Sequence, residues 1–337
     1  MGFIALSDAA PIIVAHEQGI FRRLGLNVSL QRELGWATVR DKIAFGELDA
    51  AQAISSLLIS CRLGLDTAPA KCLTACVLST GGNAITLSRR LRDNGVKDAS
   101  SLHDEIMRTR HDRQLVFGVA AAHSTHYLHL CDWLASGGIN PRRDVRIVVV
   151  PPAQVFRNLS AGTIDGYCVG EPWNSLAIQE KLGWCVKTAA ELHPGHPEKV
   201  LMVSSAFAQQ RHEEHILLII GLLEACELCD EPAFRPELVK LLTRREYLSQ
   251  SRKTIAAGLV GPFKHGNAEA SDASLFIRFF GEDLNPPSLA KAQWLVNGFR
   301  THGLLQGHPW SSPQFEREIF RPDIYAQAIA RSAAPSS

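Results

Sequence analysis

Three histidines, His123, His126 and His129, recur at every third position of one segment and could bind a metal ion or an anion. On a helix this spacing points the outer two rings in different directions, and no pair of carboxylates lies nearby in the sequence to complete a zinc site. His126 follows Ser124 and Thr125, either of which can cap a helix, so it falls in the first helical turn. Backbone N–H groups and the helix dipole favour negative charge there. The pattern therefore favours an anion near His126 over a metal.

Three further residues could line the same anion site. Trp36 opens an amphipathic segment, where it is either the floor of a pocket or an ordinary core aromatic. Asn83 follows a pair of glycines, which form either a plain turn between strands or a set of N–H donors for an oxyanion. Lys199 stands at the start of an apolar strand, where it is either solvated or a point charge that reaches a cleft.

No motif of a known catalytic or cofactor-binding type is present. The sequence has no G-x-x-x-x-G-K-[ST] phosphate loop, no G-x-G-x-x-G after its first strand, no H-E-x-x-H and no G-x-S-x-G. Two cysteines and two histidines, Cys226, Cys229, His212 and His215, match a zinc site in residue type. On one helix, however, His215 and Cys226 would lie roughly 16 Å apart, too far to share an ion. We therefore expect a protein that is not an enzyme and that uses no cofactor and no metal.

Strand and helix signals alternate along the chain and predict an α/β fold of two lobes with a ligand cleft between them. The strands expected in the first lobe are 2–6, 26–30, 72–80 and 84–88, together with a strand at 199–204 that returns the chain to this lobe. We expect lobe 1 to comprise residues 1–111 and 193–337, lobe 2 to comprise 112–192, and 332–337 to be a flexible tail. Two chain crossings between the lobes predict a hinge.

Composition narrows the class of protein. Among the 337 residues, 35 lysines and arginines balance 34 acidic residues, which disfavours direct binding to nucleic acid. No apolar run approaches the ~20 residues that cross a bilayer, and the first residues do not resemble an export signal. The 8 cysteines are scattered through apolar segments rather than arranged as a disulfide framework. These features predict a cytoplasmic protein with reduced thiols and no membrane contact.

Five longer strings carry a resemblance to a known family. They are LSDAAP at 6–11, GWATVRDKIAFGELD at 35–49, GNAITLS at 82–88, DGYCVGEPWN at 165–174 and HPEKVL at 196–201. Together they resemble the nitrate-binding family of periplasmic-type solute receptors, over most of the chain to about residue 265. The resemblance implies a periplasmic-binding-protein-like (type II) fold, whose two lobes close on an oxyanion. The ligand positions that it implies are Trp36, Asn83, His126 and Lys199, with Gln154, Gly170 and Glu171 as further candidates.

The transporter members of that family carry an export signal, a lipoprotein cysteine or a linker before the first strand, whereas this sequence begins within that strand. The resemblance therefore implies the cytoplasmic branch of NasS-like nitrate and nitrite sensors. Such a sensor holds a NasT-like, RNA-binding antiterminator as its partner until nitrate or nitrite arrives. Two alternatives stay open: a substrate-binding protein of a nitrate or bicarbonate ABC transporter, and a cytoplasmic enzyme on the same scaffold, similar to the thiamine-pyrimidine synthases. The enzyme would need a catalytic cysteine cluster, which this sequence lacks.

Overall fold

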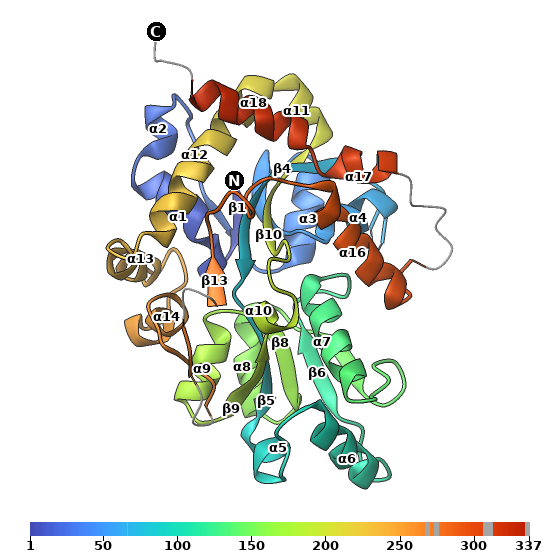
Figure 1. The fold of residues 1–337 in the computed structure, drawn as a ribbon. Coiled ribbons are helices and arrows are strands. Elements are labelled where there is room, and N and C mark those ends of the chain that lie inside the picture. Colours follow the sequence, from blue (N-terminus) through green and yellow to red (C-terminus); the bar gives the residue numbers. More distant parts are fainter. Residues whose placement is uncertain (66, 267–269, 273–275, 306–312, 334–337) are drawn as a thin grey trace.

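The computed structural model describes residues 1–65, 67–266, 270–272, 276–305 and 313–333, and two β-sheets organise them (Figure 1). The strands of the first sheet are β1 (Gly2–Ile4), β2 (Gln31–Glu33), β3 (Ala50–Ile54), β4 (Cys72–Gly81), β10 (Lys199–Ser204) and β13 (Ile277–Arg278). The strands of the second sheet are β5 (Asn83–Ser88), β6 (Val116–Val119), β7 (Arg146–Val149), β8 (Gly166–Gly170) and β9 (Gly183–Thr188). A separate antiparallel pair consists of β11 (Phe263–Lys264) and β12 (Ala270–Ser271).

Both sheets are mixed. The first has the order β13-β4-β10-β3-β1-β2, in which β1 is parallel to β2 and β3 while β10 is antiparallel to β3 and β4. The second has the order β7-β6-β8-β5-β9, in which β6 is parallel to β7 and β8 while β5 is antiparallel to β8 and β9. The α/β class predicted from the alternating pattern is therefore confirmed.

The helices surround these sheets (Figure 1). Up to residue 136 they are η1 (Ser7–Ala9), α1 (Ala10–Glu17), α2 (Ile20–Arg23), α3 (Trp36–Ala44), α4 (Leu57–Leu63), α5 (Arg89–Asp93), α6 (Ala99–Thr109) and α7 (Thr125–Ser136). From there to residue 230 they are α8 (Pro152–Ser160), α9 (Trp173–Gln179), α10 (Ala189–Leu192), α11 (Ser205–Gln210) and α12 (His212–Asp230). The remainder are α13 (Arg235–Leu242), α14 (Arg252–Leu259), α16 (Leu289–Thr301), α17 (Pro313–Ile319) and α18 (Pro322–Ser332).

Strand β10 shows why the first sheet is covered on both faces. Its side chains alternate, so that Leu201 and Val203 pack in one core with residues of α1 and α12, while Val200 and Met202 pack in another with residues of α3 and α4. A strand buried on both faces reads as a continuous apolar run, as this one does. The charged residue at its start, Lys199, is consequently buried as well.

The segment 84–88 corrects one prediction. We expected this strand in the first lobe, but β5 pairs with β8 and β9 in the second sheet. Gly81 and Gly82 cause the change, because both have left-handed backbone angles (φ of 71° and 78°) that interrupt the extended chain between β4 and β5. The chain therefore crosses outward at these glycines and returns between β9 and β10.

The segment 26–30 corrects a second prediction, that of a strand over these residues. Its apolar residues alternate as expected, yet it forms no strand, and β2 begins only at Gln31. Its ladder partner β1 begins at Gly2, which lies opposite Gln31, so the preceding residues have no neighbouring strand to pair with.

Three further observations concern membrane spans, cysteines and the C-terminal tail. Within the described residues, no helix combines the length and apolar character needed to cross a bilayer. The 8 cysteines are all buried and free. Of the predicted tail, Ser332 ends α18 and residues 334–337 lie outside the described part of the chain.

Candidate functional site

Four of the residues singled out in the sequence occupy element starts and are buried together. Trp36 begins α3 and Lys199 begins β10, both on the side of the first sheet, whereas Asn83 begins β5 and His126 is the second residue of α7, both on the side of the second. Trp36 is 1% exposed and the other three are 0% exposed. The structure therefore brings side chains of both lobes into one enclosed place.

Glu198 joins the lysine to the imidazole. The Lys199 Nζ atom lies 2.6 Å from Oε1 of Glu198 and 2.9 Å from Oδ2 of Asp8. The same Glu198 oxygen lies 3.6 Å from Nε2 of His126, and that nitrogen lies 3.1 Å from Oδ1 of Asn83. A continuous polar network thus runs from the first lobe to the second. We call these five residues the inter-lobe network.

Two N–H donors beside this network have no acceptor. The Trp36 ring packs against the lysine, with Nζ 5.5 Å from the ring centroid, while its indole Nε1 is buried without a hydrogen-bond partner among the described residues. The Nδ2 atom of Asn83 is likewise buried and unpartnered in this part of the chain. An unsatisfied buried donor costs about 1 to 3 kcal/mol, so each would gain from an acceptor such as an oxyanion.

The charges of the network are already largely balanced. Burial acts to lower the pKa of Lys199, but the two carboxylates beside it raise that pKa above its ordinary value. Burial acts to raise the pKa of Glu198, yet the charge of Lys199 beside it holds that pKa well below its usual range. For Asp8 burial prevails and raises the pKa. Burial lowers the pKa of His126 to about 3, so this imidazole is neutral at physiological pH. The lysine charge therefore faces two carboxyl groups.

Local sequence places the second-lobe residues. The Ser124 side chain accepts a hydrogen bond from the backbone N–H of Tyr127 at 3.1 Å, which begins α7 and sets His126 in its first turn. Gly170 leaves space for the network, because a Cβ atom there would lie 3.2 Å from Oδ1 of Asn83 and 3.3 Å from Oδ2 of Asp8. Gly170 therefore lies against the network, and its role as a ligand position stays a prediction.

Glu171 and Gln154, the remaining candidates, lie elsewhere. Glu171 is buried, but its two carboxylate oxygens each lie 3.3 Å from the backbone N–H of Ser175 at the start of α9, and its carbonyl accepts from the N–H of Ser7. Burial raises its pKa to about 7. Gln154 is exposed on α8. Glu171 therefore borders the network through its backbone, and Gln154 does not join it.

A cleft of about 490 Å³ lies beside Trp36, although none of the five network residues lines it. Trp36 lines it together with Thr38 of α3, the loop 120–123 after β6, and Val149 and Pro151 at the end of β7. Ligands of α/β proteins commonly bind at the carboxyl ends of parallel strands such as β6 and β7. The cleft therefore lies where a ligand entering between the lobes would first meet the Trp36 ring.

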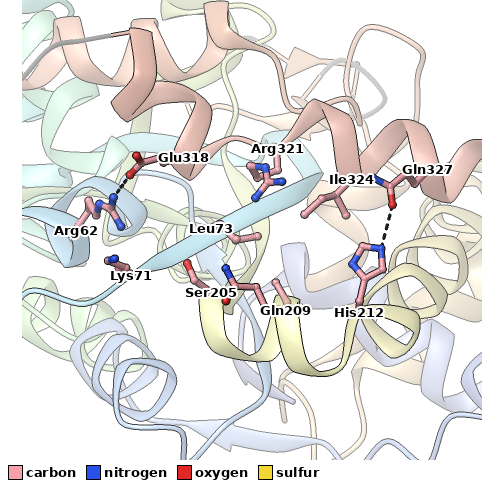
Figure 2. A pocket seen from close by; sticks show the side chains of 11 residues that line it. Arg62, Lys71, Leu73, Ser205, Gln209, His212, Glu318, Arg321, Ile324 and Gln327 are labelled. Atoms are coloured by element: carbon pink, nitrogen blue, oxygen red, sulfur yellow. Dashed lines mark hydrogen bonds and ion pairs between the residues drawn. The ribbon is translucent and has the colours of Figure 1, made fainter.

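A second cavity, of about 390 Å³, lies on the first lobe between β4, α11, α12, α17 and α18 (Figure 2). It is lined by several basic side chains, but Arg62 pairs with Glu318 and Arg321 pairs with Asp323. His212 forms a hydrogen bond of 3.0 Å with Gln327. Both arginines of this cavity are thus engaged by neighbours of the same lobe, and no side chain of the second lobe lines it.

Four residues in or beside the network were not predicted as site residues: Asp8, Glu198, Gln52 and His196. Gln52 holds Asp8 through a hydrogen bond of 2.5 Å. His196 and His129 approach the second oxygen of Glu198. The adjacent acidic and basic residues at 198 and 199 were the available signal, because two opposite charges at the start of an apolar strand must be buried together.

Comparisons with known proteins agree on one family. Residues 1–243 match the model of the NMT1-like family. The chain is 36% identical over 99% of its length to the nitrate import ATP-binding protein NrtC of Synechocystis sp., and 36% identical over 88% of its length to the bicarbonate transport ATP-binding protein CmpC of Synechococcus elongatus. It spans about half of these relatives, 50% and 44% of their lengths. Among solved structures, the periplasmic nitrate-binding protein NrtA of Synechocystis superimposes with a TM-score of 0.93 at 25% identity, covering 99% of this chain and 88% of that one. The expected two-lobed type II binding-protein fold is thereby confirmed.

Proposed function

Because the chain belongs to the NMT1-like family, we propose that it is a receptor for a small oxyanion, nitrate or nitrite, which it binds between its two lobes without catalysing a reaction. The observation that carries this proposal is the pair of buried, unpartnered donors, Trp36 Nε1 and Asn83 Nδ2, beside an enclosed network drawn from both lobes. The names of similar proteins, NrtA and NrtC, support the choice of ligand.

The physical properties of nitrate suit such a site. Nitrate is planar, singly charged and weakly hydrated, so a few N–H donors and an aromatic wall can replace its water. Since Asp8 and Glu198 already engage Lys199, the anion must rely on neutral donors and on the first turn of α7. His126 then acts by holding Asn83: when its Nε2–H donates to the Asn83 oxygen, the amide N–H groups are left for the ligand.

The finer proposal is that the chain is a cytoplasmic sensor. A ligand that contacts both lobes stabilises the closed form only by its differential affinity for that form. A protein partner that prefers the open form is then released by reciprocal linkage. We expect this partner to be a NasT-like, RNA-binding antiterminator, so that nitrate would release it to act on nitrate-assimilation transcripts.

A second candidate function follows from the length of the relatives. The chain matches 50% of NrtC and 44% of CmpC, both named as ATP-binding proteins of importers. The same oxyanion receptor could therefore serve as a ligand-binding part of a transport system, and its ligand could be bicarbonate.

Two experiments test these proposals. Calorimetric titration with nitrate, nitrite and bicarbonate should give saturable binding of nitrate or nitrite, and binding of bicarbonate alone would select the second candidate. Size-exclusion chromatography with the antiterminator should show a complex that dissociates when nitrate is added. Identical elution with and without nitrate would reject the sensor but leave the receptor standing.

A further inference from the structure

A second cluster adjoins the inter-lobe network and has the composition of a metal site. The Nε2 atoms of His129 and His196 lie 3.1 Å apart. Oε2 of Glu198 lies 3.2 Å from Nε2 of His196 and 3.9 Å from Nε2 of His129. Each of these three residues offers one ligand atom, and the three atoms all lie within 4.8 Å of one another. No other such group of three histidine, cysteine or acidic residues occurs among the described residues. Their side chains are 0% exposed.

The hydrogen atoms available to the cluster do not satisfy it. The other ring nitrogen of His196, Nδ1, lies 2.7 Å from the carbonyl oxygen of His193, so Nδ1 must carry a proton. When Nδ1 carries the only proton of this ring, Nε2 presents a lone pair to the Glu198 oxygen, which also has only lone pairs to offer. A single N–H on His129 can serve one of these atoms but not both, and Nδ1 of His129 has no partner in the described part of the chain. A cation bound by Nε2 of both rings and by the Glu198 oxygen would satisfy all three atoms at once.

The geometry suits a small divalent ion. With metal–ligand bonds of about 2.0 to 2.1 Å, two ligands of a tetrahedral ion lie about 3.3 Å apart, close to two of the three separations here. The contact from His196 Nδ1 to a backbone carbonyl is the kind of outer contact that fixes the tautomer of a metal-binding histidine. Trp294 packs beside both rings, with centroid distances of 5.9 and 5.5 Å, and limits their rotation.

We infer that His129, His196 and Glu198 bind one divalent transition-metal ion, of which Zn²⁺ is the natural candidate, at the junction of the two lobes. This inference departs from the expectation that the protein uses no metal, which rested on the divergence of the outer two histidine rings and on the lack of a carboxylate pair nearby in the sequence. The ion would connect α7 of the second lobe to the start of β10 in the first, and would leave a coordination position for water or an anion.

The ion would also change the charge of the anion site. Glu198 offers Oε2 to the ion while its Oε1 contacts Lys199 and His126, so one carboxylate serves both sites. Without a metal ion, one lysine faces two carboxyl groups, so negative charge is in excess when both are ionised. A bound divalent cation would reverse this balance and leave an excess of positive charge. We expect the metal to raise the affinity for nitrate at least tenfold. This consequence rests on the proposed function, whereas metal binding itself does not.

The test uses the full chain after removal of metals with a chelator. Titration with Zn²⁺ in nitrate-free buffer should show one saturable site, and Co²⁺ should give the intense visible absorption of a four-coordinate complex. His129→Asn and His196→Asn should each weaken Zn²⁺ binding at least about 100-fold. His215→Asn, at a buried histidine outside the cluster, should leave it unchanged, which excludes general effects of replacing a buried imidazole.

Several outcomes would overturn the inference. One is the absence of saturable Zn²⁺ binding to the wild-type chain. Another is an equal affinity for Zn²⁺ in the His129, His196 and His215 variants. If a variant fails to fold, X-ray absorption of the Zn²⁺-loaded wild-type chain decides the matter, since two imidazole ligands are expected and a spectrum without imidazole rejects the site. Nitrate titration with and without chelator is read separately: tight Zn²⁺ binding with no effect on nitrate rejects only the coupling.

Discussion

The most demanding prediction concerns Lys199→Met. The lysine lies 2.9 Å from Asp8 and 2.6 Å from Glu198, and its side chain is fully buried against Trp36. Methionine has a similar length and can keep the packing, but it removes the charge that pairs with both carboxyl groups. The substitution therefore isolates the electrostatic part of the lysine's contribution.

The expected loss follows from the cost of leaving buried carboxylates unpaired. Removing one partner of a buried ion pair typically costs about 3 to 5 kcal/mol, a large share of the roughly 5 to 15 kcal/mol that stabilises a domain. Adding Asp8→Asn removes one of the two unpaired charges. We expect the double variant to be about 2 kcal/mol more stable than Lys199→Met alone, because the asparagine oxygen can still accept the hydrogen bond from Gln52.

The assay is urea unfolding followed by circular dichroism for the two single variants, the double variant and a control. Lys240→Met is a suitable control, since Lys240 forms an exposed ion pair with Glu237 and should change the unfolding free energy by less than about 0.5 kcal/mol. A loss below about 1 kcal/mol in Lys199→Met, or additive effects of the two single substitutions, would refute the charge balance described for the network.

Three further predictions concern single residues. Trp36→Phe keeps the aromatic wall but removes the unpartnered indole N–H, so calorimetry should show roughly fivefold to tenfold weaker nitrate binding; an unchanged affinity would argue against the indole as a donor. Gly170→Ala places a Cβ atom 3.2 Å from the Asn83 oxygen and should weaken nitrate binding at least about fivefold. The circular dichroism spectrum should stay native. Wild-type affinity in this variant would mean that Asn83 does not contact the ligand. Burial raises the pKa of Glu171 to about 7, so the native state retains a proton that the unfolded chain has lost, and stability falls as pH rises from about 4.5 to about 7. In urea unfolding at about pH 5 and about pH 8, Glu171→Gln should remove about 3 kcal/mol of that fall, and equal pH dependence in both proteins would contradict the assignment.

The sequence predicted the elements well where a local signal defines them. The possible cap at Ser124 predicted the start of a helix that the structure shows as α7, and the apolar run after Lys199 predicted β10. Partner choice was harder. Nothing local to 84–88 says which sheet it joins, because that depends on the turn at Gly81 and Gly82 and on the strands that happen to lie beside it.

Part of the site was predictable from local signals in the sequence. Trp36, Asn83, His126 and Lys199 could be selected by residue type and by position at element starts, and the structure buries them together. The carboxyl groups that neutralise the lysine could not be predicted in this way. Asp8 is 191 positions from Lys199 in the sequence, and only the pairing of β10 beside β3 and β1 brings the two together. His129 was set aside because its ring diverges from its neighbours on the helix, and its contacts come instead from residues 196 and 198.

The central claim is that a small oxyanion binds between the lobes at the inter-lobe network. Calorimetric titration of nitrate into the wild-type chain and into His126→Ala tests it most directly, with His215→Ala as the control for loss of a buried imidazole. We predict one saturable site in the wild type and in the control, and binding weakened at least about tenfold in His126→Ala, because Asn83 loses the contact that directs its amide N–H groups to the ligand and a hydrogen bond from that amide to an anion is worth roughly 1.5 to 3 kcal/mol. Absence of saturable binding, or the same affinity in His126→Ala as in the wild type, would contradict the claim.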